Sequence, residues 1–175
     1  MLTFHSQIYN QPSKSNVLPI AQAVPLKEEF KAENIIVFQS AKLDLTSNPA
    51  PDIDNTAVNI VGTADDVLLQ VSIRRKENAI VLNSRPANGP WGKEERVPLK
   101  GLFVGLNTTI TVYDHGDRYQ VLIDYKTIHY FVKRFDKENG AAVLYSINPD
   151  QSTVFSGTLA ATTYDSFANI IPNGA

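Results

Sequence analysis

Polar side chains at alternate positions of an otherwise apolar segment are the first feature of this sequence that suggests chemistry. In segment 67–75, the amide of Gln70, the hydroxyl of Ser72 and the guanidinium of Arg74 alternate with apolar residues. Residues two apart in a strand lie on the same face, so these groups are expected to share a surface, and Leu68 with them. The opposite, core-facing side is expected to hold Val67, Leu69, Val71 and Ile73.

Two further runs carry polar groups that can extend this surface. In run 80–85, alternation puts Asn83 on the polar side, with Val81 and Arg85 as its neighbours on that face. If this run and 67–75 pair as a hairpin, their polar faces coincide. The third run, 94–98, places Glu94 and Arg96 on one face, directly after a loop with Trp91.

The combined groups are those that recognise a sugar. A pyranose has many hydroxyls that both donate and accept, so amides, carboxylates and guanidinium groups of fixed geometry bind it well. Its apolar C–H face can be covered by a flat aromatic ring, for which Trp91 is the candidate. Glu94 between Arg74 and Arg96 would hold both guanidinium groups in place before the ligand arrives.

Each of these residues also has a simpler interpretation. A polar residue on an outward strand face is usually just solvated. Trp91 alone is more often a loop anchor or a partly buried residue than a ligand platform. Glu94 and Arg96 alone would form a surface ion pair worth about 0–1 kcal/mol. Their joint spacing is what favours a common binding site.

The rest of the chain predicts an all-β fold that can position such a surface. Short, β-branched segments with alternating polarity are separated by turn residues, and the turns are short enough for antiparallel hairpins. This pattern predicts one domain over residues 1–175, an antiparallel two-sheet β-sandwich of the jelly-roll kind. The best helical candidate, 25–31, is too short to do more than bridge a sheet.

Composition excludes several classes of function. The chain has 16 Lys and Arg against 18 Asp and Glu, a formal net charge of −2, so we expect no nucleic-acid partner. It has no cysteine, which excludes disulfides, thiolate metal sites and a cysteine nucleophile. The N-terminus lacks the pattern of a secretory signal, and no segment reaches the roughly 20 apolar residues of a membrane span. We expect synthesis in the cytosol and no membrane insertion.

Metal and hydrolase chemistry have little support in the sequence. His5, His115 and His129 are far apart and in no metal-binding spacing, so we expect no metal and no cofactor. Glu94 and Glu95 could resemble a glycosidase pair, but adjacent strand residues point to opposite faces. We therefore expect no enzyme activity.

Two short motifs have structural or incidental interpretations. His115 precedes Gly116 in a segment that predicts a hairpin turn, in which Gly116 supplies a positive φ. Asn107 begins a glycosylation sequon, which we treat as incidental because no signal peptide precedes it.

The polar spacing resembles the signature of the galectin family, H-x-N-x-R, V-x-N and W-G-x-E-x-R on neighbouring strands. The corresponding residues here are Gln70-x-Ser72-x-Arg74, Val81-x-Asn83 and Trp91-Gly92-x-Glu94-x-Arg96. The segments VSIRRKENAIVLNSRPANGPWGKEERVPL and TITVYDHGDRYQVLIDYKT resemble mushroom galectins in particular, and the resemblance runs from about Asn34 to the C-terminus.

The resemblance implies a β-sandwich with a concave groove that binds β-galactosides without metal or cofactor. It implies that Trp91 stacks on the galactose C–H face and that Arg74, Asn83 and Glu94 take sugar hydroxyls. It also implies assembly into homo-oligomers, dimers or tetramers, that bind the glycans of glycoproteins or glycolipids, and export by a non-classical route. The carbohydrate-binding residues implied are Gln70, Ser72, Arg74, Asn83, Trp91, Glu94 and Arg96.

Two positions depart from the family pattern. Ser72 stands where many animal members have asparagine, and Gln70 replaces the histidine that contacts the axial 4-hydroxyl of galactose. The flanking sequence also resembles a mushroom subgroup that prefers N-acetylglucosamine (GlcNAc) oligomers, although that subgroup lacks the tryptophan. We predict a non-catalytic lectin for β-galactosides or related oligosaccharides containing GlcNAc or N-acetylgalactosamine (GalNAc). The alternative is a galectin-fold scaffold with lost or altered sugar binding that mediates protein–protein contact.

Overall fold

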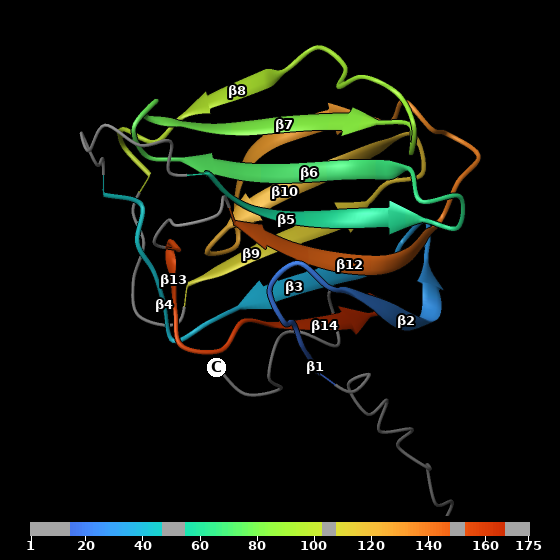
Figure 1. Ribbon diagram of the computed structural model, residues 1–175, viewed down its shortest axis with the longest axis horizontal. Coiled ribbons are helices and arrows are strands. Elements are labelled where there is room, and N and C mark those ends of the chain that lie inside the picture. The colour runs from blue at the N-terminus through green and yellow to red at the C-terminus, as the bar shows by residue number, and fades with distance from the viewer. Residues whose placement is uncertain (1–14, 47–54, 103–107, 148–152, 167–175) are drawn as a thin grey trace, which may run out of the picture.

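The computed structural model describes residues 15–46, 55–102, 108–147 and 153–166, and its named strands all pair antiparallel (Figure 1). In chain order, the strands are β1 (Asn16–Val17), β2 (Ala23–Phe30), β3 (Ile35–Gln39), β4 (Lys42–Leu43), β5 (Asn55–Gly62), β6 (Val67–Arg74), β7 (Ala79–Arg85), β8 (Glu95–Pro98), β9 (Thr109–Asp114), β10 (Arg118–Ile123), β11 (Lys126–Val132), β12 (Gly140–Ile147), β13 (Phe155–Ser156) and β14 (Ala160–Tyr164).

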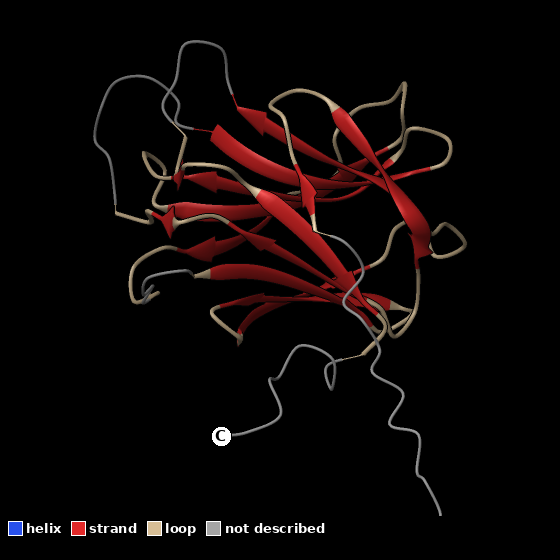
Figure 2. Ribbon diagram, turned by 90° about the horizontal axis from the view of Figure 1, so that it is seen from below, coloured by secondary structure: helices blue, strands red, loops and turns tan. Residues whose placement is uncertain are grey.

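Two six-stranded sheets form the body of the molecule. Sheet A has the order β1-β14-β3-β9-β10-β11, sheet B has the order β2-β12-β5-β6-β7-β8, and β4 pairs separately with β13. Figure 2 shows the two large sheets as stacked layers, with strands and loops as the only elements of the described residues. The predicted all-β, antiparallel two-sheet β-sandwich is confirmed. In this part of the chain, no helix is long and apolar enough to cross a membrane.

The core lies between the facing sides of the two sheets. Alternate residues of β6 and β7 are fully buried there and pack against alternate residues of β3 and β9. Across the layers, the rings of Phe30 in β2 and Tyr119 in β10 stack with centroids 6.2 Å apart. Residues of this core include Ile36, Phe38, Leu69, Val71, Ile73, Ile80, Leu82, Ile110 and Val112.

A bulge at Leu68 corrects the simple alternation predicted for β6. Val67 pairs with Val61 of β5, and Leu69 pairs with Ile60, so Leu68 has no partner on that strand. The ladder to β7 shifts at the same place. Because of the extra residue, the side chain of Leu68 points to the opposite face from the one that simple alternation predicts, and it lies in the core at 1% exposure. The outward side predicted for Leu68 was therefore wrong, because a bulge breaks the two-residue period. Val67 is buried at 6% exposure, but outside the core cluster.

The segment considered as a helical candidate, 25–31, is instead mostly strand. Residues 25–30 belong to β2, an edge strand of sheet B that pairs with β12 at Pro25 and Phe30. Val24 and Leu26 are partly buried against the core, as alternation requires. Tertiary pairing decides the structure here, because a short segment has weak helical preference of its own.

The turn between β9 and β10 has the predicted chemistry. Gly116 has a φ of 92° and donates its N–H to Asp114 Oδ1 at 2.7 Å. Two other residues considered in the sequence, His5 and Asn107 of the sequon, lie outside the described residues.

The bulge at Leu68 gives a test of the fold. Leu68→Ala is expected to lower the free energy of unfolding by about 2–5 kcal/mol, because it leaves a cavity in the core. Urea denaturation followed by circular dichroism measures this, with Val132→Ala on the exposed part of β11 as a control expected within about 0.5 kcal/mol of the parent. A loss as small as that of the control would place Leu68 on the outer face after all.

Candidate functional site

The polar surface lies on the outer face of sheet B, where β6, β7 and β8 run side by side (Figure 1). In register, Arg96 of β8 is opposite Val81 of β7, which is opposite Ser72 of β6. Gln70 is opposite Asn83 in the next row. These polar positions therefore lie on one face, as strand alternation and hairpin pairing predicted.

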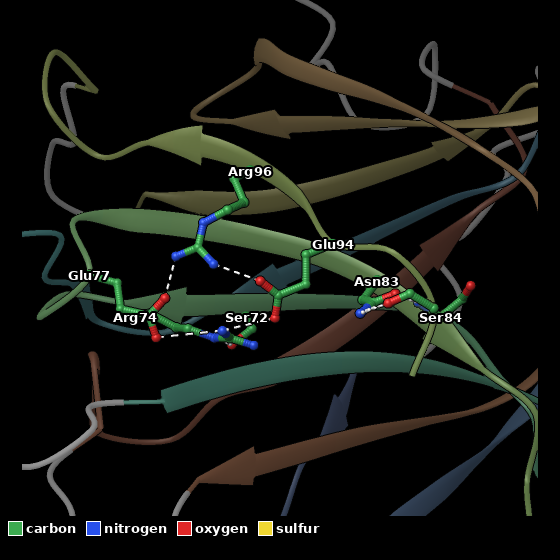
Figure 3. A network of polar contacts seen from close by, with 8 residues as sticks. Ser72, Arg74, Glu77, Asn83, Ser84, Glu94 and Arg96 are labelled. Atoms are coloured by element: carbon green, nitrogen blue, oxygen red, sulfur yellow. Dashed lines mark hydrogen bonds and ion pairs between the residues drawn. The ribbon is translucent and has the colours of Figure 1, made fainter. Parts of the chain in front are cut away.

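Four charged side chains form a network on this face (Figure 3). The Glu94 carboxylate forms an ion pair with Arg74, with Oε1 3.0 Å from Nη1, and its Oε2 accepts a hydrogen bond from Arg96 Nη1 at 2.6 Å. Glu77, from the turn between β6 and β7, also contacts both guanidinium groups: Arg74 at 3.5 Å and Arg96 through Nη2. Arg74 Nε further donates to Ser72 Oγ at 3.4 Å.

This network orders its donors in advance of any ligand. Each carboxylate bridges the same two guanidinium groups, so positive and negative charges alternate around a closed loop. Single exposed pairs are weak, but shared partners restrict the long arginine side chains to one geometry. The Arg74 side chain is 18% exposed and that of Glu94 35%, so both are accessible from solvent. A ligand hydroxyl there can accept from a guanidinium and donate to a carboxylate oxygen.

Trp91 lies in the loop between β7 and β8, three residues before Glu94. The residue is 43% exposed, which is high for so large an apolar side chain. The Arg85 guanidinium carbon lies 4.9 Å from the ring centroid, so a cation packs against one face of the indole. The exposed part of the ring offers a flat apolar surface.

Asn83 is placed on the same face but is held by protein groups. The residue is 3% exposed. Its Nδ2 donates to Gly92 O at 2.9 Å, and its Oδ1 accepts from Ser84 N at 2.9 Å and from Arg134 Nη1 at 2.8 Å. These bonds use one of the two Nδ2 hydrogens, and they tie the Trp91 loop to β7.

Gln70 is oriented by a residue that the sequence did not single out. Asn59 of β5, only 2% exposed, donates its Nδ2 to Leu144 O at 3.1 Å and to Ser146 Oγ at 3.2 Å. A backbone carbonyl can only accept, so this side of the amide must be the nitrogen. Asn59 Oδ1 therefore points to Gln70, whose Nε2 donates to it at 3.0 Å.

The two adjacent glutamates have different surroundings, as strand parity predicts. Glu94 belongs to the arginine network, whereas Glu95 turns to the other side and contacts His129 Nε2 at 2.6 Å and Arg134 Nη2 at 3.3 Å. They do not face a common ligand position. Among the described residues, no three His, Cys, Asp or Glu side chains gather in a way that could hold a metal ion.

Three residues of the site were missed by the sequence analysis. Glu77 sits three positions after Arg74, a spacing that gives a weak signal for an ion pair. Asn59 and Arg134 are distant in sequence from the residues they contact. Only the strand order of the fold brings them to the site, so no local pattern could have identified them.

Comparisons with known proteins find relatives over most of the chain. A family model described as galactoside-binding lectin matches residues 24–148. Galectin-1 of Coprinopsis cinerea is 45% identical over 123 residues, which are 70% of this chain and 77% of that protein. The anti-tumor lectin of Cyclocybe aegerita is 34% identical over 150 residues, 83% of this chain and 92% of that lectin.

Solved structures share the fold. The galectin LEC-6 of Caenorhabditis elegans superimposes with a TM-score of 0.59 at 15% identity, covering 85% of this chain and 92% of that one. A tetrameric galectin from the ball sponge Cinachyrella gives a TM-score of 0.56 at 20% identity, covering 83% and 99%. The β-sandwich is thus shared even where few residues are identical.

The charge network predicts how Glu77 titrates. The hydrogen bond from Arg96 and the nearby charge of Arg74 hold the pKa of the Glu77 carboxyl below its usual 4.5, against the opposite effect of partial burial. Because this pKa is depressed, Glu77 stabilises the fold above pH 4.5 and loses that contribution as the pH falls through its folded value. A carboxyl carbon NMR titration should show a midpoint below 4.5 that rises in Arg96→Ala. An unchanged midpoint in that variant would contradict the network.

Proposed function

The chain belongs to the galectin family, and we propose that it binds β-galactosides or related GlcNAc- and GalNAc-containing oligosaccharides, without catalysis, on the outer face of sheet B. The observation that carries this proposal is the Arg74–Glu94–Arg96 network, in which Glu94 ends a loop that holds the exposed Trp91 three residues earlier. The proposed contact residues are Gln70, Ser72, Arg74, Asn83, Trp91, Glu94 and Arg96.

The network supplies the polar half of sugar recognition. A hydroxyl near Arg74 and Glu94 can use its oxygen to accept from the guanidinium and its hydrogen to donate to the carboxylate. Because the ion pairs already hold these groups, binding costs little additional side-chain entropy.

Trp91 supplies the apolar half. The C–H face of a pyranose is poorly hydrated, and covering it with an indole removes apolar surface from water. Arg85 lies against one face of the ring, so the sugar would take the other. This contact also fixes the orientation of the ligand, since only one face of the sugar is apolar.

Gln70 supplies a directed acceptor. Its Nε2 is committed to Asn59, and within the described residues no donor reaches its Oε1. We infer that Oε1 accepts a hydrogen bond from a sugar hydroxyl or from the N–H of an acetamido group. A glutamine fixed in this way can discriminate between ligands by whether they donate at that position.

With one binding face per chain, the protein must assemble if it is to cross-link glycans. We propose a homo-oligomer, a dimer or a tetramer, that engages several glycans of a glycoprotein or glycolipid surface at once. The sponge relative described as tetrameric supports this proposal.

Trp91→Ala and Arg74→Ala test the proposed contacts. Each is expected to weaken binding to N-acetyllactosamine or chitotriose, whichever the parent binds, by at least about thirtyfold, because each removes a central contact. Isothermal titration calorimetry measures the affinity, and thermal unfolding verifies the fold. Matched controls are Tyr130→Ala and Arg118→Ala, an exposed aromatic and an exposed arginine on sheet A. If the two test variants bind as well as these controls, the outer face of sheet B is not the binding site.

A series of fluorinated ligands tests the role of Gln70. Replacing the one hydroxyl that donates to Oε1 by fluorine is expected to weaken binding to the parent about tenfold, because a C–F group cannot donate. In Gln70→Met the same replacement should have little further effect. The position at which this coupling appears identifies the sugar atom that Gln70 contacts. Equal losses in parent and variant at every position would show that Gln70 does not meet the ligand.

A further inference from the structure

Arg134 connects the two sheets at the edge where the Trp91 loop lies. It follows β11 of sheet A, yet its guanidinium reaches groups of sheet B. Nη1 donates to Asn83 Oδ1 at 2.8 Å, and Nη2 donates to the backbone oxygen of Lys93 and to Glu95 Oε1, the last at 3.3 Å. The guanidinium carbon also lies 4.7 Å from the ring centroid of Phe131, so the group is held from both sides.

The same guanidinium fixes the loop a second time through Asn83. Because Asn83 Oδ1 accepts from Arg134, the amide nitrogen points to the loop and donates to Gly92 O at 2.9 Å. Gly92 N in turn donates to Ser84 O at 3.0 Å. Gly92 and Lys93 are thus anchored through backbone atoms, and these two residues lie directly between Trp91 and Glu94.

Gly92 shows how closely Arg134 approaches. A Cβ atom at this position would lie 2.3 Å from Arg134 Nη1, and 3.3 Å from Asn83 Oδ1 and Ser84 O. Gly92 does not have a positive φ, so its backbone conformation is one that an alanine can also adopt. A side chain at this position would therefore displace the Arg134 guanidinium from its place against the loop.

We propose that Arg134 is a positioning residue for the ligand surface: from the opposite sheet it sets where the Trp91 ring and the Glu94 carboxylate stand. The inference rests on the proposed function of this surface, but the placement of the loop can be measured without a ligand. Among the described residues, Arg134 does not contact the arginine network itself, so its effect passes through Gly92, Lys93 and Asn83.

A purely structural brace would behave differently. An arginine that only joins the sheets would lower stability when removed and leave the indole environment and the affinity unchanged. A positioning residue changes both. Trp91 is the single tryptophan of the chain, so its fluorescence reports on the loop alone.

The variants are chosen to separate these roles. Arg134→Met keeps much of the apolar stem on Phe131 but removes all donors, and Arg134→Lys keeps the charge and cannot bridge the separate acceptors. If the methionine variant fails to fold, the lysine variant carries the test. Arg118→Met, an exposed arginine on the same sheet, is the matched control.

Two readouts are expected to change together. In the ligand-free Arg134 variants, acrylamide should quench Trp91 more efficiently than in the parent, and the emission maximum should shift to the red as the ring becomes more hydrated. The affinity for the glycan that the parent binds should fall about tenfold, because donors to a backbone oxygen and to an amide are lost. Arg118→Met should match the parent in both.

Gly92→Ala supplies an independent variant. In the parent, the added methyl meets the Arg134 guanidinium and is expected to produce the same quenching and loss of affinity. In Arg134→Met the guanidinium is absent, so the added methyl group no longer meets Nη1. The fold-loss of affinity in the double variant should therefore be clearly smaller than the product of the fold-losses in the two single variants.

The possible results are distinct. Parent-like quenching and affinity in both Arg134 variants, or independent effects of Gly92→Ala and Arg134→Met, would overturn the proposal. A third result is possible: the Arg134 variants change the quenching of Trp91, but the parent protein itself binds no glycan. This result would uphold the placement of the loop by Arg134 and reject the proposed function.

Discussion

The register of β6 against β5 and β7 is the constraint on which the polar surface depends. Strand side chains alternate, so a slip of one residue would exchange Gln70, Ser72 and Arg74 with the core residues between them. Each large apolar side chain that moved to water would cost about 1.5–3 kcal/mol, so the core fixes the register. The residues that resist the slip are Leu69, Val71 and Ile73. The binding surface is thus positioned by the burial behind it.

The third part of the surface comes from β8, a short strand at the edge of sheet B, and an edge strand needs support from elsewhere. Successive glutamates provide it on both sides. Glu94 joins the arginine network on the outer face, and Glu95 turns toward sheet A, where it meets His129 and Arg134. Binding chemistry and fold support therefore meet in one short segment, and each depends on the opposite directions of adjacent strand residues.

The alternation of polar and apolar residues was enough to predict the fold class. It also predicted that Glu94 shares a face with the polar groups of β6 and β7. It failed at Leu68, because a bulge adds one residue and no composition rule marks where a bulge falls. It also missed Asn59 and Arg134, whose contacts join strands far apart in sequence. Glu77 was within reach of sequence reasoning, since it follows Arg74 across a turn. What depends on strand order cannot be read from a local pattern, and this includes the support beneath the site.

The central claim is that this face of sheet B recognises sugars. A glycan array probed with the purified parent protein tests it most directly, because no ligand has to be chosen beforehand. The account predicts selective binding to β-galactosides or to oligosaccharides that contain GlcNAc or GalNAc. An array without binding, obtained with folded protein, would contradict it and favour a galectin-fold scaffold that contacts other proteins.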